Sequence, residues 1–334
     1  MGVFLKNNIK IEAPAYELVS ENIVSTGTTS ITISGLNITK EDEYLLVASI
    51  YNPQASTARI RPFFNGNNTT TNYWQEFRAS IGTTTTAGRE NLSNLSNIGG
   101  GCRVFVTARL NVAEDGTITW QVSETTNTYP ATSVQTVEAY CTSTFTVTSI
   151  TSIEINSTLA SAIGAGSEFR LYKLVAEKVF DTTVSGSAVS YIDITGLSIT
   201  DDNEYLLTAT FENTSATDSK VFMFVNGNTT NTNYYSQTIT ANTSTLTSSR
   251  GNESVFSGCN TGKASYCVAN IFVTNGNRFV CQGHTARNLD SAILILDRYA
   301  TSTFDVSTIT SIRVQSEITN ALGVGTRIRL YKLK

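Results

Sequence analysis

The single histidine and the five cysteines are the residues of this 334-residue chain best suited to nucleophilic or acid–base chemistry. Cys281 and His284 are close enough in sequence to suggest a thiol–imidazole pair, but no nucleophile signature surrounds them. The chain contains an internal duplication, which places Trp120 and Ser123 at the corresponding positions, so such a site would exist only once. We therefore expect no catalytic residues and no enzymatic activity.

Metal ligation has little more support than catalysis. Cys259 and Cys267 are eight residues apart, and no cysteine pair has the C-x-x-C spacing typical of zinc sites. The acidic clusters at residues 41–43 and 201–204 could offer oxygen ligands to calcium, but they lack the alternating spacing of a calcium loop. Solvated turns before strands are the favoured interpretation of both clusters. No metal and no cofactor is expected.

Two aromatic pairs, Tyr73-Trp74 and Tyr234-Tyr235, are the remaining candidates for a functional site. Each pair follows an asparagine, and amphipathic rings of this kind can stack on the flat face of a sugar. The alternative is packing in a core or in an interface between subunits. These four residues form the predicted ligand or interface site, and a host glycan is the ligand that they suggest.

The composition indicates which elements position these residues. The chain contains 52 Thr, 35 Ser and 29 Asn, about a third of all residues, which favours strands joined by turns. Hydrophobic residues make up 40% without any run long enough to span a bilayer. A net charge of −4 without a basic stripe argues against binding to nucleic acid. We expect a folded all-β protein with neither nucleic acid nor membrane as a partner.

The cysteines and the first residues indicate the compartment. Five is an odd number, and the cysteines do not recur at corresponding positions of the duplication, so a disulfide framework is not expected. We interpret them as buried free thiols in a reducing compartment. The first eight residues lack the apolar stretch of a secretory signal, which favours assembly in a cytoplasm.

A tandem duplication organises the chain. The pattern of residues 35–46 returns at residues 196–207, a shift of 161, and residues 150–153 return at residues 309–312, a shift of 159. Each copy has about 160 residues, enough for an independent hydrophobic core. The predicted organisation is an N-terminal arm at residues 1–15, repeat 1 at residues 16–174 and repeat 2 at residues 175–334.

Alternating apolar residues predict the architecture of each repeat. Apolar and polar residues alternate over residues 104–112 and 118–122, the pattern of a strand with one buried face. Asp115-Gly116 and Asn275-Gly276 fall between two such runs and predict hairpins. Seven or eight strands per repeat follow from the spacing of the turns. The predicted fold is two tandem antiparallel β-sandwich domains, jelly-roll-like, arising from the duplication.

The end of each repeat carries a recognisable motif. Residues 166–174 read G-S-E-F-R-L-Y-K-L after an I-T-S-I strand, and residues 325–333 repeat the motif with Thr326 and Ile328 in place of Ser and Phe. With the opening at residues 18–36, the motif resembles the β-sandwich domains of tailed-bacteriophage virion structural proteins. The resemblance implies a non-enzymatic component of the head, tail or fibre, located in the virion.

The resemblance also suggests partners. A decoration or head-fibre protein on the capsid exterior would pack on other virion proteins, either capsid or tail subunits, and two domains per chain are compatible with a homo-oligomer such as a trimer. A tail, baseplate or fibre adhesin that binds host carbohydrate is the alternative. Ile9 and Ile11 alternate with polar residues in the N-terminal arm, so we expect this arm to dock by adding a strand to a sheet edge.

Overall fold

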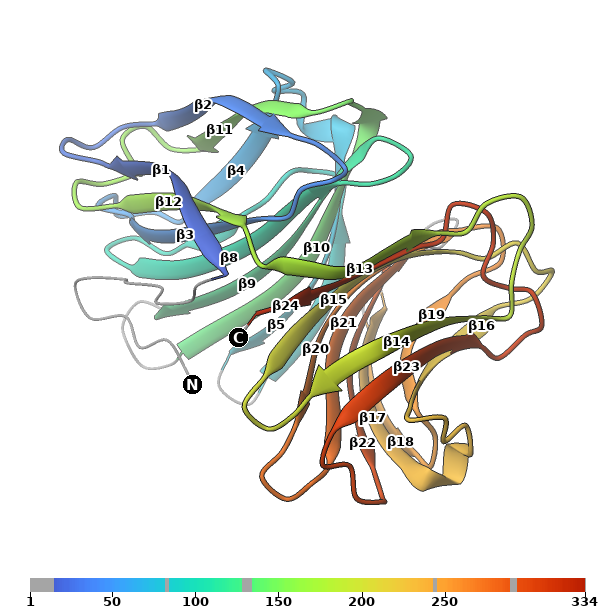
Figure 1. Cartoon of the computed structure of the whole chain (residues 1–334). Coiled ribbons are helices and arrows are strands. Elements are labelled where there is room, and N and C mark those ends of the chain that lie inside the picture. The colour runs from blue at the N-terminus through green and yellow to red at the C-terminus, as the bar shows by residue number, and fades with distance from the viewer. Residues whose placement is uncertain (1–14, 82–83, 128–133, 243–244, 289–292, 334) are drawn as a thin grey trace.

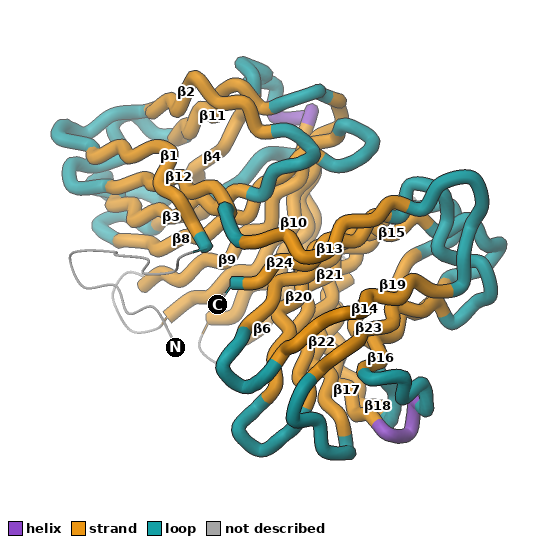
Figure 2. Tube along the Cα trace, viewed as in Figure 1, coloured by secondary structure: helices purple, strands orange, loops and turns teal. Residues whose placement is uncertain are grey.

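The computed structural model describes residues 15–81, 84–127, 134–242, 245–288 and 293–333. Antiparallel strands form four sheets, one of eight strands and one of four strands in each repeat, and this confirms the predicted all-β sandwich fold (Figure 1). Two 3-10 turns, η1 (Thr70–Asn72) and η2 (Asn231–Asn233), are the helical segments of the described residues (Figure 2). Ile9 and Ile11 of the predicted docking arm lie outside the described residues.

Repeat 1 has the strand order of a jelly roll with four strands added. The order β1-β12-β3-β8 in the larger sheet, facing β2-β11-β4-β7 in the smaller sheet, is the jelly-roll arrangement. The larger sheet then continues through β9, β10, β5 and β6. The strands are β1 (Tyr16–Ile23), β2 (Ser30–Ile38), β3 (Tyr44–Tyr51), β4 (Ala58–Phe64), β5 (Tyr73–Ile81), β6 (Thr84–Glu90), β7 (Ser96–Ile98), β8 (Arg103–Val112), β9 (Thr117–Asn127), β10 (Val134–Thr146), β11 (Ile150–Ser157) and β12 (Glu168–Leu174).

Repeat 2 reproduces this arrangement strand for strand, with β13-β24-β15-β20-β21-β22-β17-β18 facing β14-β23-β16-β19. The strands are β13 (Glu177–Thr183), β14 (Tyr191–Ile199), β15 (Glu204–Glu212), β16 (Ser219–Val225), β17 (Tyr234–Asn242), β18 (Thr245–Gly251), β19 (Val255–Cys259), β20 (Ala264–Val273), β21 (Phe279–Asn288), β22 (Ile293–Ser302), β23 (Ile309–Ser316) and β24 (Arg327–Lys332).

The expected number of strands was too low, because the structure contains twelve in the described part of each repeat. β6 reads T-T-T-A-G-R-E and offers no apolar alternation that would reveal a strand. The four added strands face the core with side chains such as Tyr73 and Trp120, and they widen the outer face of the larger sheet.

Each repeat buries its own core between its two sheets. Alternate residues of β8 and β9 point inward, among them Val104, Val106 and Trp120, and the hairpin joins these strands where Asp115-Gly116 predicted it. Repeat 2 has a separate core around Phe211, Phe256 and other buried side chains. All five cysteines are buried and unpaired in the structure, as the sequence analysis expected.

One tyrosine in each core ties a turn to the sandwich. The Tyr73 hydroxyl accepts a hydrogen bond from the backbone N–H of Phe64 (3.2 Å) and donates one to the carbonyl of Asn67 (2.8 Å). Tyr234 makes the same two contacts in repeat 2, at 3.1 and 2.8 Å. Both rings are fully buried, so neither hydroxyl can exchange its partners for water.

We expect Tyr73→Phe and Tyr234→Phe each to lower the free energy of unfolding by about 1–2 kcal/mol, since each leaves two buried backbone groups without a partner. Urea unfolding of the full chain measures this change. Tyr235→Phe is the control, because its side chain is half exposed and should cost less than about 0.5 kcal/mol. Equal costs for the buried and the exposed tyrosines would contradict the prediction.

Candidate functional site

The structure separates the four predicted aromatic residues into two groups. Tyr73 and Tyr234 are fully buried and pack edge-on against Trp120 and Phe279 respectively. Burial removes both from the predicted ligand site, because the first residue of each strand points into the core and the second points away. The next residues, Trp74 and Tyr235, lie on the outer face of the larger sheets.

Trp74 and Tyr235 have different surroundings, although they occupy corresponding positions. The guanidinium of Arg89 lies over the Trp74 ring, 4.2 Å from its centroid, and leaves this side chain partly buried. Tyr235 is 49% exposed. Trp74 is therefore partly covered, whereas Tyr235 is available to a ligand.

Tyr235 borders an open groove of about 660 Å³ on the outer face of repeat 2. A second tyrosine on the groove, Tyr299, is also 49% exposed, and its hydroxyl accepts a hydrogen bond from the side-chain amide of Gln282 (2.8 Å). The groove is built entirely by the added strands. Its lining residues are Tyr235, Ser236 and Gln237 of β17, Arg250 of β18, Val280 of β21, and Tyr299, Ala300 and Thr301 of β22.

The sequence analysis missed Tyr299 as a groove residue. The sequence did offer a signal for another groove residue, Arg250. Aligning the repeats places Arg250 at the position of Arg89, which stacks on Trp74, and so near Tyr235. What the alignment does not reveal is that β22 lies next to β17, because the two strands are more than 50 residues apart in the chain.

The outer faces of the two eight-stranded sheets pack against each other between the two smaller sheets (Figure 1). An apolar cluster seals one part of this contact, where Ala15 and Leu174 of repeat 1 meet Leu206, Tyr266 and Tyr331 of repeat 2. The Tyr140 ring of repeat 1 lies 6.4 Å from the Tyr266 ring, centroid to centroid. The repeats thus form one packed unit.

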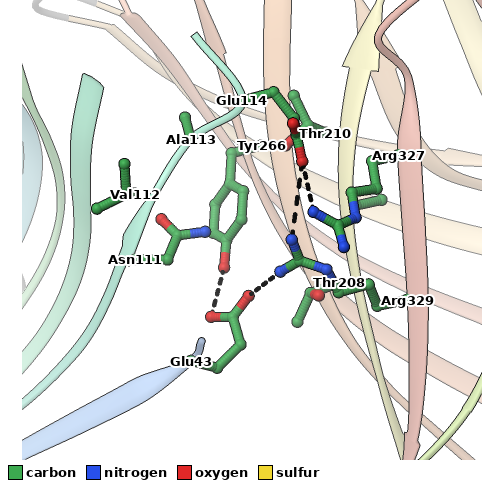
Figure 3. Close-up of a pocket in the computed structure, with 11 residues that line it drawn as sticks. Glu43, Asn111, Val112, Ala113, Glu114, Thr208, Thr210, Tyr266, Arg327 and Arg329 are labelled. Carbon is green, nitrogen blue, oxygen red and sulfur yellow. Dashed lines mark hydrogen bonds and ion pairs between the residues drawn. The ribbon is translucent and has the colours of Figure 1, made fainter. Parts of the chain in front are cut away.

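Charged side chains lie in the same contact (Figure 3). Arg327 binds Glu41 (2.9 Å) and Glu114 (2.7 Å) of repeat 1. Next to it Arg329 lies 3.6 Å from Glu43, and the Tyr266 hydroxyl donates to the same carboxylate (3.2 Å). The acidic cluster at residues 41–43 is therefore not the solvated turn that we expected.

These contacts set the protonation of the carboxylates. Burial alone would raise the pKa of Asp181, but hydrogen bonds from Arg327 and Lys178 lower it to about 2. The same arginine lowers the pKa of Glu41 and, against the opposing effect of burial, that of Glu114. All three are charged at neutral pH and compensate Arg327, which is itself buried. The cluster joins the two repeats and offers no free group for catalysis.

A polar cavity of about 260 Å³ lies elsewhere in the contact and contains His284. Its Nδ1 lies 2.7 Å from Asp297, which is also paired with Arg78 of repeat 1. Burial and the charges of Arg109 and Arg78 lower the pKa of His284 to about 4, so the ring is neutral at pH 7. Cys281 points to the other face of β21, into the core, so the two residues cannot act as a pair.

The cavity brings corresponding residues of the two repeats together. Its lining residues form the pairs Thr107 and Val268, Arg109 and Asn270, Gln121 and Gln282, and Ser123 and His284, with Leu45 in addition. The larger sheets therefore meet here as the halves of a two-fold pair would. The relation fails at the edge of the contact, where Tyr140 packs on Tyr266 while Tyr299, the counterpart of Tyr140, stays exposed.

Each core also buries a charge-bearing residue, other than its cysteines, that the other core lacks. Burial raises the pKa of Glu124 in repeat 1 to about 8, an effect that the nearby Ser96 hydroxyl only partly offsets. Thr285 takes this position in repeat 2. Conversely, repeat 2 buries Arg298, which donates to the carbonyl of Ser257, where repeat 1 has Ala139.

Other chemistry finds little support in the residues that the structure describes. No three His, Cys, Asp or Glu side chains among them lie together where they could hold a metal ion. Burial raises the pKa of Cys259 to about 12 and that of Cys267 to about 11, which disfavours the reactive thiolate. No helix in this part of the chain has the length and apolar character needed to cross a membrane.

Comparison with known proteins gives no family. No protein-family model matches the chain, and no curated protein matches its sequence. Among solved structures, domains LG4-5 of the mouse laminin alpha1 chain cover 93% of this chain and 92% of their own, at 9% identity and a TM-score of 0.20. The attachment invasion locus protein Ail of Yersinia pestis covers 75% and 98%, at 6% identity and a TM-score of 0.13. Similarities this low support no inference about function.

We expect Arg327→Gln to lower the free energy of unfolding by about 1–3 kcal/mol at pH 7, because it removes the buried cation that carboxylates of both repeats share. The carboxylates titrate near pH 4 in the unfolded chain and lower in the folded chain, so their contribution is present at neutral pH and is lost as the pH falls toward 2. The difference between the two proteins should therefore shrink below about pH 4.5.

Urea unfolding at a series of pH values measures this difference. Lys220→Gln, which breaks a pair with Glu253 within repeat 2, is the control and should cost at most about 1 kcal/mol. An Arg327→Gln effect as small as that of the control, or one that does not change with pH, would contradict the prediction.

Glu124→Gln should raise the free energy of unfolding at neutral pH, whereas Arg327→Gln should lower it. The folded chain holds Glu124 protonated up to about pH 8, whereas the unfolded chain ionises it near 4.5, so stability is lost as the pH rises between these values. A neutral glutamine removes this cost, and we expect it to stabilise the chain by about 3 kcal/mol at pH 7 and by almost nothing below pH 4.5. Thermal and urea unfolding at both pH values test this, with the exposed Glu17→Gln as the control. Destabilisation at pH 7 would refute it.

Proposed function

We propose that this chain is a non-enzymatic structural protein of a tailed-bacteriophage particle, located on the capsid exterior as a decoration or head-fibre protein. It would act by packing on other virion subunits, with no chemical step. A tail or baseplate location is the related alternative.

The observation that carries this proposal is the closing motif of each repeat, with its resemblance to phage virion domains. The motif occupies β12 and β24, which take the same place in the two larger sheets, second from the edge. In repeat 2 the same strand supplies Arg327 and Arg329, which join the repeats. A packed pair of sandwiches, each with its own core, suits a protein whose task is to remain folded on a particle surface.

The open groove of repeat 2 favours a second candidate function, the recognition of host carbohydrate. Two half-exposed tyrosines beside amide and hydroxyl groups are the side chains that sugar recognition uses. The two functions are compatible in one chain, because the described residues that line the groove belong to repeat 2, whereas the residues proposed for docking belong to the N-terminal arm.

Immunogold electron microscopy of purified particles tests the structural role. An antibody to this chain should label the heads, and label confined to tails would move the protein to the alternative location. Particles that carry none of the chain would refute the proposal. Antibody absorbed beforehand with the purified chain is the control.

Deletion of residues 1–14 tests the docking arm. We expect fewer copies of the chain on particles, because the deletion removes the residues proposed to add a strand to another subunit. Ala15 is kept, because it is buried between the repeats and its carbonyl accepts a hydrogen bond from Val175. Undiminished incorporation of a folded variant would refute the role of the arm.

A further inference from the structure

The groove of repeat 2 has a charge without a partner among the residues that the structure describes. Arg250 is exposed and is the one charged side chain among the described residues that line the groove. The residue opposite it on β17 is Gln237, a neutral amide. An anionic ligand would therefore find an unpaired guanidinium at the edge of a groove lined by two tyrosines.

The corresponding positions of repeat 1 show that this charge is particular to repeat 2. There, Glu76 stands opposite Arg89, so an acid takes the place of Gln237. Glu76 is fully buried, and Arg89 stacks on Trp74. Repeat 1 thus partly covers its aromatic side chain and places an acid opposite its arginine, whereas repeat 2 leaves the tyrosine open and places a neutral amide there.

The second tyrosine differs between the repeats in the same way. Tyr140 of repeat 1 packs against Tyr266 in the contact between the repeats. Its counterpart Tyr299 has no ring packed on it among the described residues and is half exposed on the groove. The side-chain amide of Gln282 binds its hydroxyl and fixes the position of the ring.

From these contacts we propose that the groove formed by Tyr235, Tyr299 and Arg250 binds an oligosaccharide that carries a carboxylate. The tyrosine rings stack on sugar faces, and Arg250 pairs with the carboxylate, while Gln237 and Thr301 offer hydrogen bonds to hydroxyl groups. A volume of about 660 Å³ is in the range of small-ligand sites. This inference rests on the carbohydrate-binding function proposed for repeat 2 and specifies its site and ligand class.

The experiment uses the full chain and an array of oligosaccharides in matched pairs. Each pair consists of a uronic-acid-containing oligosaccharide and the same oligosaccharide with its carboxyl groups reduced to alcohols. The strongest pair is then titrated by calorimetry. We expect the acidic member to bind at least tenfold more tightly than the neutral member, with the difference falling as salt is added.

Four variants locate the site. Arg250→Gln should remove the preference for the acidic member and leave binding of the neutral member unchanged. Tyr299→Ala and Tyr235→Ala should each weaken both members by tenfold or more. Tyr299→Phe keeps the ring, so it should retain most of the affinity and covers the case in which Tyr299→Ala fails to fold.

Repeat 2 offers a matched control pair. Tyr191 is 48% exposed, and Arg313 stacks on its ring at 4.0 Å, but Asp193 already pairs with this arginine. Tyr191→Ala and Arg313→Gln should leave binding of both members unchanged. Trp74→Ala, in the covered surface of repeat 1, should do the same.

Every result that differs from these expectations overturns a specific claim. Equal binding of the acidic and neutral members refutes the carboxylate preference and leaves carbohydrate binding in place. No binding to any member of the array refutes the carbohydrate-binding function itself. A loss with Arg313→Gln as large as that with Arg250→Gln, or equally tight binding of a polyglutamate peptide, shows that the chain responds to charge alone and refutes the site.

Discussion

Arg327 and Arg329 are buried among carboxylates of the other repeat, and the rest of the structure depends on this contact. Each repeat adds four strands to one sheet of a jelly roll, and the added strands widen the outer face of that sheet. The outer face of such a sheet carries unpartnered apolar and polar side chains. Packing the two wide sheets together covers most of these side chains, and the ions in the contact are tolerable only because each has a partner.

The same contact explains why the repeats have diverged where they have. Residues that meet across the central cavity keep a near two-fold relation, as Gln121 and Gln282 do. At the edge of the contact the relation fails, and there one copy of a residue is covered while the other is exposed. Tyr140 and Tyr299 are the clearest case. An imperfect two-fold contact between two copies of one domain therefore leaves one surface of the pair unused by the fold.

The sequence predicted the fold well, because its signals are local or repeated. Asp115-Gly116 and the alternation around Trp120 lie within one hairpin, and the shift of 161 residues relates whole domains. The site was harder to predict. Tyr235 was identified from its neighbour in the chain, but Tyr299 reaches the groove only because β22 pairs with β17. Period-two alternation also separates Tyr234 from Tyr235, so the two could not both face a ligand. The role of Glu43 depends on Arg329, which is 286 residues away and belongs to the other repeat.

Glu124 and Arg298 have a consequence for the history of the gene. Each core buries a charge-bearing side chain, and the other core has Thr285 or Ala139 at that place. A recombinant gene whose crossover fell between the positions of Glu124 and Ala139 would encode Glu124 and Arg298 together in one core, or neither of them. The two copies are therefore no longer interchangeable within a sandwich.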